Sequence, residues 1–351
     1  MKTIAKLFMI ALFAIAFGPT KVKAQQAALK TDSAHLLLDT ILNFTKSRSL
    51  YRDKVNWKTV EDSVRATAAN ATSIKDALPA VQLLYKLLGD HHGFITYKKK
   101  TYGWKDGNKP LDKMAHPALV KKIREGYKLT PKRLEKGYAY LLVPDNNPTH
   151  NGDIGKIAKQ IRDSLALFNP RGLKGIIIDL RLNPGGAMWP MIGGLSALFE
   201  PGKLGAFIFP ASQKQEEWGI KKNITNSIVY DDTDTVCNVQ SRGKNLHDLK
   251  VVVLIGPYTC SSGEALAISF KGRKNTWFIG ENTGGYTTAN DSFQFNSKIG
   301  FFLATSVEAD RNGQIYLDNV KPDEEITGAD DFDNLKNDQK VIAALKWLKR
   351  K

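Results

Sequence analysis

The sequence predicts an α/β protein with a largely parallel β-sheet. Two continuous apolar runs carry this prediction, at residues 173–182 (LKGIIIDLRL) and 249–256 (LKVVVLIG). Runs of this length that are rich in β-branched residues and end in Gly or Pro are typical of fully buried strands. A helix-like segment follows each run, and a further strand and helix precede the first, at residues 137–143 and 153–168. This alternation of strands and helices indicates parallel pairing.

Residues 1–24 have the pattern of a signal peptide. Lys2 and Lys6 precede an apolar run at residues 7–17, and residues 22–24 (VKA) resemble a cleavage site. The apolar run is too short to cross a bilayer, and no other stretch approaches ~20 consecutive apolar residues. We therefore expect export to a periplasm or to the outside, and no integral membrane segment after signal removal.

Residues 25–97 predict a small N-terminal helical subdomain. Three segments carry apolar residues at helical spacing, and each begins at a residue type that caps helices: near Thr31, after Asn56 and at Ser73. Such amphipathic helices must pack together or on the next domain. We expect their role to be structural.

Two histidines follow the third helix, in the motif Asp90-His91-His92-Gly93. A strand is expected directly after them, at residues 94–97. Because adjacent residues of an extended segment point to different sides, the pair cannot easily chelate one metal ion. A surface position, a general base and a metal site are the alternatives, in that order of preference.

The rest of the chain is divided into a connecting segment and a core. Residues 98–136 are rich in lysine and irregular, with a short helix expected near residues 119–125. The catalytic α/β core is expected to span residues 137–351. Within it, residues 205–248 are polar and weakly patterned, so we interpret them as an excursion or lid. The core then continues with strands and a closing helix, at residues 276–280, 299–307, 314–317 and 339–349.

Composition argues against a nucleic-acid partner. The formal net charge is +16, which can attract nucleic acid or an anionic surface. However, the lysines are spread along the chain, and no zinc-finger or RNA-binding aromatic motif accompanies them. The only cysteines, Cys237 and Cys260, are too few for a disulfide framework, and we expect both to be free.

Residues 259–264 (TCSSGE) place two serines where a strand breaks into a helix. A helix N-terminus supplies free N–H groups and the positive end of a dipole to a developing oxyanion. On this stretch alone, an ordinary serine N-cap is the better interpretation. A nucleophilic serine also needs a base within hydrogen-bond reach, and a neutral imidazole suits that role near pH 7.

The order of the motifs strengthens the catalytic interpretation. DHHG (90–93), DLRLNPGG (179–186), TCSSGE (259–264) and GENTGG (280–285), with VKPD (320–323) after them, resemble the serine peptidase family of the C-terminal processing peptidases and the tricorn core peptidase. The resemblance covers roughly residues 73–326. It implies a ClpP/crotonase-like core, cleavage of peptides through an acyl-enzyme, and neither a cofactor nor a metal.

The resemblance also assigns roles to residues. Ser261 matches the nucleophile, and His92 matches the histidine of the D-x-H motif in the tricorn-like branch. Gly185, Gly186 and the N–H of Ser262 match the oxyanion donors. Tyr286 stands where the processing branch has its base lysine, so it is expected to line the substrate cleft and to leave His92 as the base.

The third catalytic member, an acid that orients the imidazole, has no clear match. Asp318, Glu281 and Glu264 are the candidates. The family often carries a PDZ domain between the helical part and the core, but the roughly 40 residues available here are too few for one.

The leading hypothesis is an exported serine peptidase that cleaves peptides or proteins. A non-catalytic exported peptide-binding relative, which kept the cleft and lost turnover, is the main alternative, because the lysine is absent and the acid is not placed. An esterase is the third, since acyl transfer to water serves esters too. The sequence does not indicate an oligomeric state.

Overall fold

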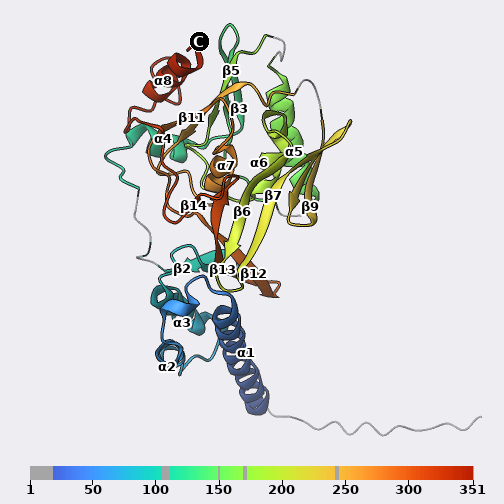
Figure 1. Ribbon diagram of the computed structural model, residues 1–351. Coiled ribbons are helices and arrows are strands. Elements are labelled where there is room, and N and C mark those ends of the chain that lie inside the picture. Colours follow the sequence, from blue (N-terminus) through green and yellow to red (C-terminus); the bar gives the residue numbers. More distant parts are fainter. Residues whose placement is uncertain are drawn as a thin grey trace, which may run out of the picture.

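The computed structural model describes residues 19–104, 107, 111–148, 151–168, 172–241 and 245–350. In this part of the chain, a layer of helices lies below a larger α/β part in Figure 1. Residues 1–18 of the expected signal peptide lie outside the described residues, and residues 19–24 form the start of a helix. No described helix combines the length and the hydropathy needed to cross a membrane.

The N-terminal helices are α1 (Pro19–Arg48), η1 (Arg52–Lys54), α2 (Trp57–Thr67) and α3 (Ile74–Leu88). α2 and α3 begin where the sequence predicts, because the side chains of Asn56 and Ser73 accept backbone N–H groups of the first turn. α1 begins at Pro19 rather than near Thr31. The apolar faces of these helices pack on one another and on one end of the antiparallel sheet described below.

A six-stranded, largely parallel sheet confirms the predicted α/β class. Its order is β15-β11-β10-β5-β4-β3, and only β3 runs antiparallel to its neighbour. The two apolar runs of the sequence become the adjacent central strands β5 and β10. The strands are β3 (Thr130–Glu135), β4 (Tyr138–Leu142), β5 (Gly175–Asp179), β10 (Lys250–Ile255), β11 (Thr276–Gly280) and β15 (Glu324–Glu325).

Helices cover both faces of this sheet. α4 (Pro117–Glu125) and α8 (Gln339–Leu348) pack where Val252 and Leu254 point. On the opposite face, Val251 and Val253 belong to the same core as four helical segments: α5 (Asn151–Ala166), α6 (Met188–Gly194), η2 (Ser196–Leu198) and α7 (Ser262–Phe270). Because side chains alternate between faces, a strand covered on both sides must be apolar throughout.

A second, nine-stranded sheet lies beyond α5, α6 and α7. Its order is β2-β1-β13-β6-β7-β8-β9, and β12 and β14 also pair with β13. Its strands are β1 (Phe94–Tyr97), β2 (Lys100–Gly103), β6 (Gly202–Phe209), β7 (Lys214–Lys222), β8 (Asn226–Asp231), β9 (Asp234–Gln240), β12 (Thr288–Asn296), β13 (Ile299–Asp310) and β14 (Ile315–Tyr316).

The interpretation of residues 205–248 as an excursion or lid is wrong. Most of this segment forms the antiparallel strands β6 to β9. Trp218, Ile220 and Val229 are fully buried in the main core, whereas the other face of β7 carries Gln215, Glu217 and Lys221. An antiparallel strand with one wet face has only half the apolar signal of a buried one, which explains the error. The connecting segment 98–136 likewise contributes β2 and β3 to the two sheets.

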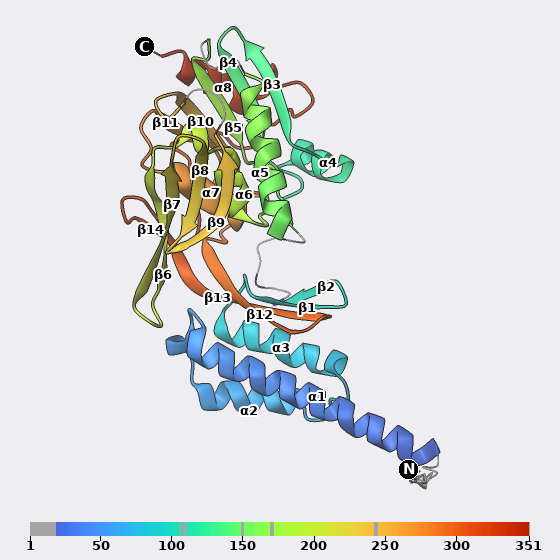
Figure 2. The same ribbon diagram turned by 90° about the vertical axis from the view of Figure 1, so that its right-hand side faces the viewer.

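The long strand β13 joins the two parts of the molecule. Its first half pairs with β1 and packs against the N-terminal helices, and its second half pairs with β6 of the α/β part. Figure 2 shows β12 and β13 running between the α/β part and the N-terminal helices. Side chains on β1, β12 and β13 can therefore meet loops of the parallel sheet.

Candidate active site

Two turns of the parallel sheet lie side by side. β5 and β10 are parallel neighbours, so the turns after them, 183–186 and 256–261, meet at the same edge. The Cys260 N–H donates to the Asn183 carbonyl at 3.0 Å and ties one turn to the other. The serine motif and the Gly-Gly motif are thus brought together.

Ser261 holds a conformation that few residues adopt. Its φ is 51° and its ψ is −123°, directly before the first residue of α7. A non-glycine residue in such a region costs on the order of 1–3 kcal/mol, and this strain is typical of functional turns. A sharp turn from a strand into a helix exposes the serine hydroxyl to the cleft.

His92 lies beside this hydroxyl although 169 residues separate the two in sequence. Its Nε2 is 3.0 Å from Ser261 Oγ, and its Nδ1 is 2.7 Å from Thr288 Oγ1. Burial, helped by the charge of His91, lowers the pKa of His92 to about 4. The ring is therefore neutral at pH 7. With Nδ1–H donated to Thr288, Nε2 is free to accept the serine proton.

Asp90 fixes the backbone on which His92 is carried. Its buried carboxylate accepts the N–H groups of His92 at 3.0 Å, Gly93 at 2.7 Å and Ala304 of β13 at 3.1 Å. These three bonds hold the α3–β1 junction against β13. The backbone that carries the His92 imidazole is thus fixed relative to β13.

His91 and Tyr286 occupy different places from His92. His91 Nε2 is 2.9 Å from the Gly285 carbonyl oxygen. Tyr286 packs edge-on against both imidazoles, with ring centroids 5.3 Å from His91 and 5.2 Å from His92. Burial raises the pKa of Tyr286 to about 12, so this phenol is a poor base at neutral pH. It lines the cleft.

Two residues that line the cleft, Gly186 and Ser262, have backbone N–H groups without a partner in the described part of the chain. The third expected donor, Gly185, already donates to Asn183 Oδ1 at 3.1 Å. The Ser262 hydroxyl donates to the Gly186 carbonyl at 2.7 Å and links the two free donors. Gly186 has φ 97°, and a Cβ there would lie 1.6 Å from the Asn146 carbonyl oxygen. Only glycine fits this position.

None of the three acids expected to orient the imidazole contacts His92. Glu264 is fully buried and instead accepts the N–H groups of Ser261, Gly285 and Tyr286, at 2.8, 2.9 and 2.8 Å. The Thr283 hydroxyl also donates to it. Burial raises the pKa of Glu264 to about 7 in spite of these donors. Glu264 therefore shapes the turn that carries Ser261 and the 283–286 loop.

Glu281 and Asp318 lie elsewhere. Glu281 bonds His116 and Lys340 in a buried polar network, and the side chain of Asp318 is exposed. The group at Nδ1 of His92 is instead a neutral hydroxyl, that of Thr288.

Sequence reasoning missed two residues of this site. Thr288 begins β12, two residues after Tyr286, and no motif marks it. Glu308 of β13 lines the cleft with only 3% of its surface exposed, and its Oε2 has no partner among the described residues. Burial raises the pKa of Glu308 well above its usual range. The available signal was an acid directly after the predicted strand 299–307.

The cleft that contains Ser261 and His92 has a volume of about 1330 Å³. Aromatic side chains form much of its wall: Phe94, Tyr102, Trp104, Trp189, Phe207 and Phe302. Among the described lining residues, Glu308 is the only acid, and none is a lysine or an arginine. Such a surface suits an extended segment with apolar side chains.

Groups that could share a metal ion lie outside this cleft. Within the described residues, the one cluster of three such side chains is Glu200, His247 and Asp248, and none of them lines the cleft.

Cys237 and Cys260 are both free, as predicted.

Comparison with known proteins gives matches over most of the chain. The family model described as Peptidase family S41 matches residues 137–326. The nisin-resistance protein of Lactococcus lactis subsp. lactis is 23% identical over 305 residues, which cover 86% of this chain and 82% of that protein.

Solved structures share the fold. A lipoprotein from Streptococcus agalactiae superposes with a TM-score of 0.66 and 19% identity, over 91% of this chain and 96% of that chain. The photosystem II D1 C-terminal processing protease gives a TM-score of 0.51 and 13% identity, over 84% and 93%.

Proposed function

The chain belongs to peptidase family S41, and from this premise we propose that it is an exported serine peptidase with Ser261 as nucleophile and His92 as general base. One observation carries the proposal: the 3.0 Å contact between His92 Nε2 and Ser261 Oγ. A nucleophile and a base within hydrogen-bond reach, with a third group on the far side of the base, are the signature of acyl-enzyme chemistry.

The proposed reaction begins with attack by Ser261 Oγ on the carbonyl carbon of the scissile peptide bond. The hydroxyl proton passes to His92 Nε2, and the carbonyl oxygen becomes an oxyanion that accepts the N–H groups of Gly186 and Ser262. When the C–N bond breaks, His92 gives its proton to the leaving amine. A water molecule then attacks the acyl-enzyme with His92 again as base, and the acid product and free Ser261 are released.

Thr288 takes the place of an orienting acid in this proposal. As an acceptor of the Nδ1–H, it selects the tautomer in which Nε2 is a base. A neutral oxygen stabilises the transient imidazolium less than a carboxylate would, because charge-assisted hydrogen bonds are stronger. This weaker stabilisation of the imidazolium favours the alternative, a peptide-binding relative that does not cleave its ligand.

The substrates are proposed to be peptides or unfolded protein segments that present apolar side chains to the aromatic cleft. The similarity to a nisin-resistance protein makes nisin the first peptide to test. An extracellular or cell-envelope location is supported by the N-terminal pattern of the sequence and by the similarity to a lipoprotein.

A fluorophosphonate probe tests the chemistry without a known substrate. Intact mass should show one adduct on the wild-type protein and none on Ser261→Ala. A wild-type protein that stays unlabelled while a control serine peptidase reacts would favour the peptide-binding alternative. Hydrolysis of nitrophenyl esters without cleavage of any peptide, nisin included, would favour an esterase.

A further inference from the structure

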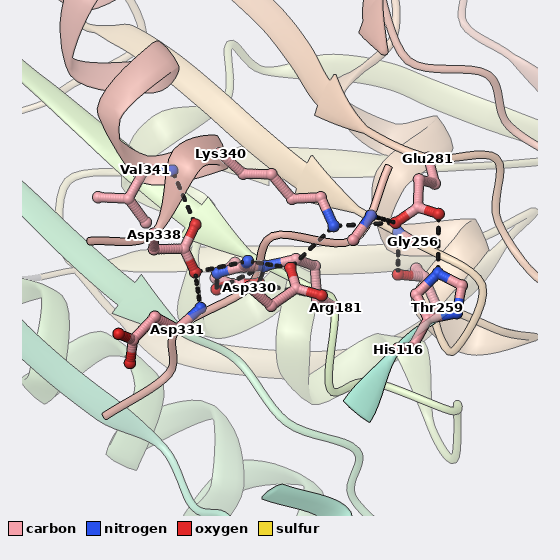
Figure 3. A network of polar contacts seen from close by, with 12 residues as sticks. His116, Arg181, Gly256, Thr259, Glu281, Asp330, Asp331, Asp338, Lys340 and Val341 are labelled. Carbon is pink, nitrogen blue, oxygen red and sulfur yellow. Dashed lines mark hydrogen bonds and ion pairs between the residues drawn. The ribbon is translucent and has the colours of Figure 1, made fainter. Parts of the chain in front are cut away.

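We propose that His116, which lies outside the cleft, is a positioning residue whose imidazolium holds the 281–286 loop of the active site, and that loss of its proton loosens this loop as the pH rises. The effect on activity rests on the proposed function, whereas the effect on the loop does not. The proposal concerns a buried network of polar side chains that joins His116 to Glu281, Lys340 and Arg181 (Figure 3).

The surroundings of His116 require both ring nitrogens to carry a proton. Nε2 is 2.8 Å from Glu281 Oε1, and Nδ1 is 2.9 Å from the carbonyl oxygen of Asp112. A carbonyl oxygen can only accept, so Nδ1 must donate. Only 7% of the surface of His116 is exposed, so water does not replace these partners.

Glu281 is a carboxylate, and it too can only accept. Its second oxygen accepts Lys340 Nζ at 2.9 Å and the Gly328 N–H at 3.2 Å. Burial alone would raise the pKa of Glu281, but the hydrogen bonds from His116 and Lys340 lower it below its usual range. Nε2 of His116 must therefore donate as well, and the ring is an imidazolium.

The charges of the network point to the same conclusion. With a neutral His116, the two described cations Arg181 and Lys340 would face the four carboxylates that bond them. The carboxylates are those of Asp179, Asp330, Asp338 and Glu281, which bond Arg181 or Lys340. An excess of buried negative charge over positive charge is disfavoured, because each buried charge must be compensated. The cationic ring reduces this excess of negative charge.

The proton of His116 is lost above the usual pH for histidine. Burial by itself would lower the pKa of His116, but the hydrogen bonds to Glu281 and to the Asp112 carbonyl outweigh it and raise the pKa. Lys340 opposes this rise through its like charge. After deprotonation, one ring nitrogen directs a lone pair at an acceptor, and one of the two bonds is lost.

Glu281 transmits this change to the active site because it begins the loop that carries Tyr286. Within the same loop, Gly285 and Tyr286 donate to Glu264, which in turn accepts the Ser261 N–H. The Gly285 carbonyl contacts His91. His116 therefore holds Glu281, at the start of the 281–286 loop. The end of this loop, at Gly285 and Tyr286, shapes both the cleft and the turn that carries Ser261.

The test combines three measurements between pH 5 and pH 9 on the full chain. The His116 ring is followed by NMR, with His116→Gln used for assignment. Protection factors from hydrogen exchange are measured for residues 283–286, and the rate of Ser261 labelling by the fluorophosphonate is measured in parallel. His35→Gln, at an exposed site on α1, is the matched control.

In the wild type, His116 should titrate above the ~6.5 of an ordinary histidine. As the pH rises through this titration, the protection factors of residues 283–286 should fall roughly ten-fold, as expected for the loss of one charge-assisted hydrogen bond. Labelling of Ser261 should slow over the same pH range. His116→Gln should show the low protection and the slow labelling at every pH, without a step. His35→Gln should keep the wild-type profile.

A His116 ring that titrates at or below ~6.5, or loop protection that is unchanged in His116→Gln, would overturn the proposal. A wild-type protein that never labels would refute the chemistry of Ser261 instead. The ring titration and the exchange data would then still decide whether His116 holds the loop.

Discussion

Thr288→Val is the most informative single substitution at this site. Valine keeps the β-branched shape that suits β12 but removes the oxygen 2.7 Å from His92 Nδ1. The Nδ1–H would then be buried without an acceptor, because His92 and Thr288 are both less than 10% exposed. Leaving a buried donor unsatisfied costs ~1–3 kcal/mol, so labelling of Ser261 should slow roughly 5- to 150-fold.

Thr287→Val is the matched control for this experiment. Thr287 is the preceding residue and equally buried, but its hydroxyl has no partner among the described residues. Its removal should therefore leave labelling unchanged and should not destabilise the fold. The assay is the second-order rate of fluorophosphonate labelling, with thermal unfolding measured on both variants. If Thr288→Val labelled at the wild-type rate, or if Thr287→Val lost as much, the proposed orienting role of Thr288 would be wrong.

Three further predictions concern the residues around the base. His92→Ala should abolish labelling and His91→Ala should retain most of it, because only His92 reaches Ser261; the reverse result would reassign the base. The His92 ring should stay neutral, and thus active as a base, down to about pH 4, rather than titrating at the ~6.5 of a free imidazole; NMR of the ring would reveal protonation between pH 6 and pH 7 if burial did not act as argued. Tyr286→Phe should label at nearly the wild-type rate and Tyr286→Lys should gain nothing, since a phenol with a pKa of about 12 is not the base; labelling that appears only above pH 9 and is lost in Tyr286→Phe would contradict this.

The elements that carry the nucleophile could be predicted because their signals are local. The runs that became β5 and β10 are apolar on both faces, and parallel pairing alone brings their following turns to one edge. Asn56 and Ser73 likewise mark the starts of α2 and α3, because their side chains cap these helices through short-range hydrogen bonds. Such features need no knowledge of the distant chain.

The partners of the base could not be predicted because they depend on strand register. Thr288 faces His92 only because β12 and β1 both pair with β13, and a shift of one residue would turn its side chain to the other face. Glu264 and Glu281 were reasonable candidates as acids close to the motifs. Their carboxylates are occupied by backbone N–H groups and by a buried cation, and sequence spacing does not reveal such bonds.

The candidate site combines residues from inside and outside the region that the family model matches. The matched region, residues 137–326, contains Ser261 and both N–H groups proposed as oxyanion donors but not His92. The proposed base, His92, lies at the junction of α3 and β1, and Asp90 ties that junction to Ala304 in the middle of β13. β13 continues into the α/β part, where it pairs with β6, so one strand fixes the base relative to the nucleophile. The bonds from Asp90 to β13 and from His92 to Thr288 of β12 therefore set the distance on which the proposed chemistry depends.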